Sequence, residues 1–172
     1  HGNQMPSTPL AKGRYTKGVY HINMIDEITQ YEIIAAVEKI SEAYLETILA
    51  YLLDNFPFVI HEFHSDNGSE YINEMVVTLL NKMLIKLTKS RPRRSTDNAL
   101  AEGKNGSIIR KWMGYGFIEQ KYANKINEEF YFKCFNEYVN YHRPCAFATD
   151  IVDKKGKVKK VYKQENYQTP YE

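Results

Sequence analysis

The 172-residue chain has few features that mark a protein for export or for insertion into a membrane. No apolar run approaches the roughly 20 residues that a membrane-spanning helix needs, and no signal-peptide pattern stands at the N-terminus. The two cysteines, Cys134 and Cys145, form no C-x-x-C pair, which favours free thiols in a reducing compartment. We therefore expect a cytoplasmic protein.

The chain also lacks a strong excess of one charge, since its net charge is +2. Composition alone does not mark it as a nucleic-acid-binding protein. The basic residues are unevenly placed, however: 82–94 and 154–163 each hold six lysines or arginines and no acidic residue. No internal repeat is visible. A length of 172 residues predicts one domain, and an apolar share of 43% is enough for a real core.

The hydrophobic pattern alternates between strand-like and helix-like segments, which predicts a mixed α/β fold. We divide the chain into an irregular arm (1–17), a core (18–148) and a basic C-terminal β-hairpin around Gly156 (149–172). Within the core the predicted elements are an antiparallel hairpin (19–26 and 31–37), a helix capped by Ser41 that runs to about 55, a central-type strand (58–63), a helix (73–84), a short strand (85–88), and helices at 99–114 and 127–141.

Two carboxylates stand at the ends of predicted elements. Asp66 comes just after the strand 58–63, and Glu102 begins the helix that Asp97 or Asn98 would cap, with residues 67–101 between them. Such a pair can converge on a hard cation that prefers oxygen ligands. Two cations about 3.5–4 Å apart would clamp the attacking and leaving oxygens of a phosphodiester. The alternative to a metal site is that both carboxylates are solvated surface groups.

The segments around these carboxylates resemble a known family. They read FHSDNGSEY (63–71), TKSRP (88–92), DN (97–98), E-x-KNG (102–106) and YHRPC (141–145). The ordered set is similar to the catalytic core of DDE transposases and retroviral-type integrases, and most similar to bacterial insertion-sequence transposases. The resemblance covers about Gly18 to Glu172, which is nearly the whole chain.

The resemblance implies a ribonuclease H-like fold, with a mixed sheet and helices on both faces. It also implies a polynucleotidyl transferase that hydrolyses a phosphodiester at a transposon end and then joins the freed 3′-hydroxyl to target DNA. Asp66 and Glu102 would bind Mg²⁺ or Mn²⁺, while Asn67 and Gly68 would position the loop. The protein would act as a homo-oligomer on DNA in the bacterial nucleoid.

Basic residues flank the helix of Glu102 and are candidates for contact with DNA phosphates. Alternatively, these residues form a solvated basic surface that binds no DNA. The family's DNA contact one turn after the Glu falls on Gly106 here, so Asn105 is the nearest polar substitute. The candidates are Lys89, Arg91, Arg93, Arg94, Lys104, Asn105, Arg110 and Lys111.

The family's first catalytic Asp has no counterpart before Asp26. We expect Asp26 to be a turn residue, and we expect the missing Asp to lie on a central strand upstream of His1. His64 is expected to be a hydrogen-bonded structural group. Two other functions stay open: a ribonuclease H-like nuclease that only hydrolyses, and a catalytically dead, DNA-binding remnant of a transposase.

Overall fold

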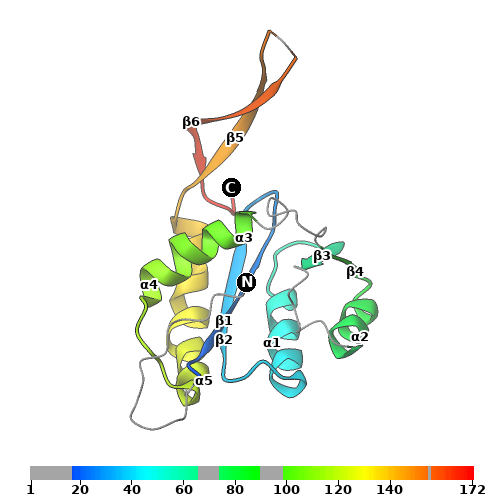
Figure 1. Cartoon of the computed structure of the whole chain (residues 1–172), viewed down its shortest axis with the longest axis vertical. Helices are drawn as coiled ribbons and strands as arrows, with labels where there is room; N and C mark the ends of the chain where they lie inside the picture. The colour runs from blue at the N-terminus through cyan, green and yellow to red at the C-terminus, as the bar shows by residue number, and fades with distance from the viewer. Residues whose placement is uncertain (1–16, 66–73, 90–98, 155) are drawn as a thin grey trace.

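The structure, a computed structural model, describes residues 17–65, 74–89, 99–154 and 156–172. Within them lie three two-stranded sheets and several helices, so the predicted mixed α/β class is confirmed. Figure 1 shows the hairpin β1–β2 between two groups of helices, with α3 to α5 on one side and α1 and α2 on the other. None of the helices in the described ranges is long and apolar enough to cross a membrane.

The first sheet is the predicted antiparallel hairpin of β1 (Tyr20–Ile25) and β2 (Glu32–Val37). Asp26 closes its turn, because one carboxylate oxygen accepts hydrogen bonds from the backbone N–H and the hydroxyl of Thr29, both at 2.7 Å. The prediction that Asp26 is a turn residue is therefore confirmed. Every residue of β2 is buried, so this strand lies at the centre of the packing.

Three asparagines bind the outer edge of β2, where another strand would otherwise pair. The amide of Asn140 accepts a hydrogen bond from the Glu32 backbone N–H at 2.8 Å and donates one to the Glu32 carbonyl at 2.7 Å. Asn136 and Asn127 make the same pair of bonds with Ile34 and Ala36. These side chains satisfy backbone groups that would be costly to bury without partners.

These asparagines lie on a helical path that winds more widely than an α-helix. The path runs through the 3₁₀ turn η3 (Gln120–Tyr122), α5 (Ala123–Ile126) and the π-helical segments η4 (Asn127–Phe135) and η5 (Tyr138–His142). The sequence predicted its start at 127, seven residues too late. The early turns are short, half-exposed segments with little apolar periodicity, apart from buried Ala123.

The helices α1 (Glu42–Asp54) and α2 (Glu74–Lys82) agree with the prediction. Leu52 and Leu80 are almost fully buried in a cluster that also contains Ile33 of β2 and Ile85, which precedes β4. A second cluster lies on the opposite face of the hairpin. It joins Ile34 and Ala36 of β2 to Ile108, Ile109, Tyr131, Phe135 and Val139.

The predicted central strand at 58–63 is wrong in position and in character. The strand β3 (Glu62–Ser65) is shorter and later, and its side chains alternate between exposed and half-buried. It pairs in parallel with β4 (Lys86–Lys89), and that pairing begins only at Glu62 opposite Lys86. His61 still accepts a hydrogen bond from the Lys86 N–H at 2.9 Å, but the chain before it is not part of the strand, and Val59 is 76% exposed.

The third sheet is the C-terminal hairpin of β5 (Cys145–Val152) and β6 (Val158–Gln168). It projects from the rest of the molecule in Figure 1. Gly156 lies in its turn with a φ of 77°, a left-handed backbone conformation that favours glycine. The hairpin starts at Cys145, so it crosses the boundary that the sequence suggested after residue 148.

Candidate functional site

The parallel strands β3 and β4 end side by side, with Ser65 opposite Lys89. Asp66 follows β3 directly in the chain, and the basic segment that contains Arg91 follows β4 directly. Carboxyl ends of parallel strands are a common place for ligand sites in α/β proteins. The residues Asp66, Asn67, Gly68, Arg91, Arg93 and Arg94, and the side chain of Lys89, lie outside what the structure describes.

A hydrogen-bonded group of side chains joins the two strands before these ends. Thr88 donates to the Glu62 carboxylate at 2.8 Å, and its hydroxyl lies 2.9 Å from Nδ1 of His64. The hydrogen bond from Thr88, helped by nearby Lys86, lowers the pKa of Glu62. His64 thus has the structural hydrogen bond that the sequence suggested.

Glu102 is exposed on α3 (Ala99–Lys104), the first part of a helical path that continues through η2 (Asn105–Arg110) and α4 (Lys111–Met113). Asn105 is half-buried and accepts a hydrogen bond from Asn23 at 3.4 Å, which ties it to β1. Arg110 is half-buried and Lys111 is exposed. Among the helix residues proposed to contact DNA, Lys111 is thus the most accessible to a large ligand.

Lys104 does not lie on the surface as the sequence suggested, because it is only 5% exposed. Its ammonium donates to Oε1 of Glu32 at 3.2 Å and to Sγ of Cys145 at 3.2 Å. Burial raises the pKa of the Glu32 carboxyl, and the charge of Lys104 opposes that rise. Lys104 therefore holds α3 against β2 and the start of β5, and its burial argues against a contact with DNA in this conformation.

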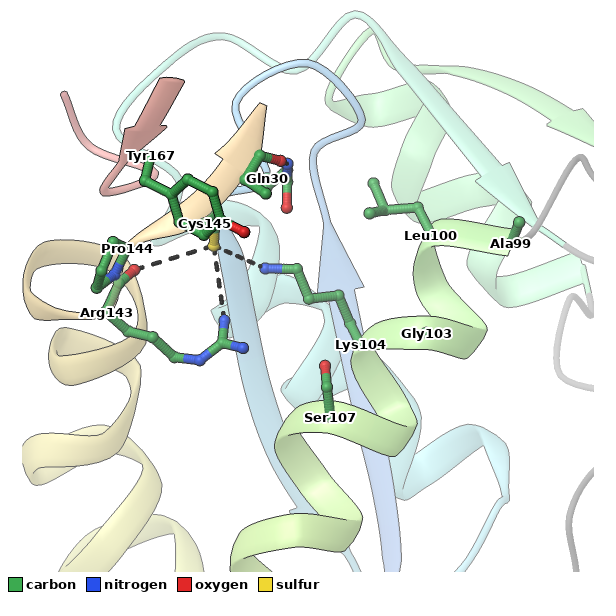
Figure 2. Close-up of a pocket in the computed structure, with 11 residues that line it drawn as sticks. Gln30, Ala99, Leu100, Gly103, Lys104, Ser107, Arg143, Pro144, Cys145 and Tyr167 are labelled. Carbon is green, nitrogen blue, oxygen red and sulfur yellow. Dashed lines mark hydrogen bonds between the residues drawn. The ribbon is translucent and has the colours of Figure 1, made fainter. Parts of the chain in front are cut away.

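A cavity of about 410 Å³ opens beside this ion pair, between α3, η2 and the start of β5. Figure 2 shows Lys104, Ser107 and Arg143 around it. Nη1 of Arg143 lies 3.6 Å from the same sulfur of Cys145 that Lys104 contacts. Sequence reasoning missed this group as a unit. The adjacent Arg-Pro-Cys at 143–145 was a signal, but nothing in the sequence brings it beside Lys104 and Glu32.

Of the two residues proposed to bind a metal, Glu102 lies in the described part of the chain. Carboxylate oxygens are the ligands that Mg²⁺ prefers, and Glu102 is exposed and able to supply them. Within the described ranges, no three His, Cys, Asp or Glu side chains gather in one group. Asp66 lies outside these ranges, so a site shared by Asp66 and Glu102 stays a prediction. Both cysteines are free thiols.

Comparison with known proteins adds little to this geometry. No known protein family matches the chain. Over 61 residues it is 41% identical to a protein of Sinorhizobium fredii (strain NBRC 101917 / NGR234) named "Uncharacterized protein y4rM". The matched segment makes up 36% of this chain and spans only 17% of that protein, whose name states no activity.

Proposed function

We propose that the chain belongs to the catalytic core of a DDE-type transposase with a ribonuclease H-like fold, which acts on DNA ends and target DNA. The observation that supports this most is the parallel pairing of β3 and β4, in which Ser65, the residue before Asp66, lies opposite Lys89, the last residue of β4. Glu102, with an exposed carboxylate on α3, is the second proposed ligand. The ordered motifs of the sequence give these residues their roles.

In this proposal Asp66 and Glu102 hold the divalent cation and thereby fix the position of the scissile phosphate. Bound Mg²⁺ or Mn²⁺ would supply activation of the attacking oxygen and stabilisation of the leaving oxygen. The basic segment that contains Arg91, together with Lys111, binds phosphates on either side of the cut. Oligomerisation on paired DNA ends is part of the same proposal.

A third carboxylate would complete the metal site, and the arrangement of the sheets suggests where it belongs. In the part of the chain described, β1–β2 and β3–β4 are not hydrogen-bonded to each other. A strand between them would unite the two pairs in one mixed sheet. Because Asp26 is engaged in its turn, we propose that such a strand, rather than the β1–β2 turn, carries the third carboxylate.

The test is a nicking and strand-transfer assay on plasmid DNA with Mg²⁺ or Mn²⁺. It compares this chain with a longer one, made by reading the coding DNA upstream of His1. We expect the chain with the additional strand to cut. Asp66→Asn and Glu102→Gln should each lower cutting by about a hundredfold or more, because several kcal/mol of transition-state stabilisation are lost.

The matched controls are Asp54→Asn and Glu46→Gln, since both residues are exposed on α1. They should leave cutting unchanged. Cutting without a joined product would instead identify a nuclease that only hydrolyses. DNA binding without cutting by either chain would identify a remnant and contradict the proposed catalysis.

A further inference from the structure

Arg143 is a cation that makes no close ion pair with any described residue, although its charge reaches the Glu32 carboxylate, which is already paired with Lys104. It follows η5 and is half-buried beside the cavity of Figure 2. None of the ion pairs among the described residues includes it. Its side-chain contact is the hydrogen bond to Sγ of Cys145 at 3.6 Å, which is long and weak. A guanidinium carries five N–H donors and stays charged, so most of its donors are left for a ligand or for water.

The charges around the cavity do not cancel. Lys104 and Glu32 form a buried pair at 3.2 Å and neutralise each other. Arg143 approaches the same sulfur as Lys104, so a second positive charge stands next to this pair. Two cations held close together in a partly dehydrated place repel each other. One bound anion would remove the surplus charge.

The donors around the cavity suit one kind of anion. Ser107 lines the cavity and is exposed, so its hydroxyl is accessible to a bound anion. Figure 2 shows Ser107, Arg143 and Lys104 among the side chains that line the cavity. A planar guanidinium fork beside a hydroxyl matches the several oxygens of a phosphate group. The volume of about 410 Å³ leaves room for a phosphate and its waters.

We propose that this cavity is a phosphate-binding site, with Arg143 as its main ligand and Ser107 as a supporting donor, while buried Lys104 contributes positive charge without touching the phosphate. The phosphate comes either from a DNA backbone or from free phosphate in solution. Gly103 lines the cavity and directly follows Glu102. A backbone phosphate bound here would hold DNA beside the proposed metal ligand, and this part of the inference rests on the proposed function.

The first experiment measures binding of inorganic phosphate without DNA. Thermal unfolding of the full chain is followed as phosphate replaces chloride at constant ionic strength and pH. A ligand that binds the native state raises the melting temperature. We expect a rise for the wild type and for Lys133→Gln, which removes one exposed cation from η4, and none for Arg143→Gln. An equal rise in Arg143→Gln would overturn the proposal.

Ser107→Ala covers the case in which Arg143→Gln does not fold, because Ser107 is exposed and its loss leaves the ion pair intact. This variant should need severalfold more phosphate for the same rise in melting temperature. If Arg143→Gln does not fold and Ser107→Ala behaves like the wild type, the site is refuted.

The second experiment identifies the source of the phosphate. Binding of a short DNA duplex is measured by fluorescence anisotropy at several salt concentrations, without divalent metal. If the site binds a backbone phosphate, Arg143→Gln should reduce the slope of log K against log salt by about 0.9, the value for one contact. Lys133→Gln should keep the wild-type slope. A wild-type slope in Arg143→Gln, together with the lost response to inorganic phosphate, assigns the site to free phosphate.

These outcomes separate the site from the proposed transposase activity. If Arg143→Gln weakens DNA binding but the wild-type chain never cuts DNA, the site is supported and the proposed activity is contradicted. If the Arg143→Gln variant still cuts DNA, binds DNA and responds to phosphate as the wild type does, the activity is supported and the site is refuted.

Discussion

At the scale of single residues, Asn140 makes an unusually large number of hydrogen bonds. Its side chain is 1% exposed and bonds both backbone groups of Glu32 as well as the Asn136 carbonyl. Asn140→Ala would leave buried backbone groups without partners, at about 1–3 kcal/mol for each group. We expect urea denaturation to show a loss of roughly 2–4 kcal/mol in the free energy of unfolding.

Asn124→Ala is the matched control, because Asn124 is an exposed residue of α5. It should change the free energy of unfolding by no more than about 0.5 kcal/mol. Similar effects of both substitutions would mean that water replaces Asn140 at the edge of β2.

The burial of His21 should make the stability of the protein depend on pH. Burial lowers its pKa from 6.5 to about 4, and its Nδ1 lies 2.8 Å from the Tyr131 hydroxyl. Below pH 6.5 the unfolded chain takes up a proton at His21, whereas the folded chain does not until about pH 4. The free energy of unfolding should therefore fall as the pH drops through this window, by about 3 kcal/mol from this residue.

The measurement is urea denaturation of the wild type and His21→Gln across the same pH range. The variant has no proton to gain at this position, so its stability should decline less steeply with acid. Equal slopes for the two proteins would show that His21 keeps an ordinary pKa.

At the scale of elements, the end of α2 has the hydrogen bonds of a Schellman motif but not its usual glycine. Ile85 N–H donates to the Leu80 carbonyl at 2.8 Å and Leu84 N–H to the Asn81 carbonyl at 3.1 Å. Leu84 has a φ of 57° and is 90% exposed, so it carries a strained backbone without a buried side chain. Glycine adopts this conformation without the clash of a Cβ atom.

We therefore expect Leu84→Gly to raise the free energy of unfolding by about 0.5–1 kcal/mol, measured by urea denaturation. Leu84→Ala removes the same exposed leucine but keeps the Cβ atom, so it should give no such gain. If glycine destabilises the protein more than alanine does, the Leu84 side chain has a role in packing.

At the scale of the whole molecule, the strand pairs β1–β2 and β3–β4 are joined by packing rather than by hydrogen bonds. Leu80 of α2 is 1% exposed in the cluster that contains Ile33 of β2 and Ile85. Leu80→Ala should cost about 2–5 kcal/mol through a cavity at this junction. The single Trp112 lies in the other half of the molecule, against Phe135 and Tyr138.

Trp112 fluorescence therefore reports on the half of the molecule that contains Phe135 and Tyr138, whereas far-ultraviolet circular dichroism reports on the secondary structure of the whole chain. If the two clusters unfold cooperatively, Leu80→Ala should shift both urea transitions by the same amount. A shift in circular dichroism alone, with the Trp112 transition unchanged, would show two units that unfold separately.

The sequence by itself determined the elements whose patterns are local. The hairpin β1–β2, its Asp26 turn, α1, α2 and the C-terminal hairpin follow from alternation, 3.6-residue periodicity and turn residues, which act over a few positions. The motifs that suggest a transposase are also properties of the sequence, as are the position of Asp66 just after a strand and that of Glu102 in the first turn of a helix.

Only the tertiary structure decided which polar residues are buried. Asn127 and Asn136 are about two and a half α-helical turns apart, so periodicity puts them on opposite faces. The wider winding of η4 turns both toward β2. Lys104 and Arg143 stand in exposed-looking contexts in the sequence, yet they meet at Cys145 because α3 packs beside the start of β5. Such burial depends on contacts between residues far apart in the chain, which local patterns do not encode.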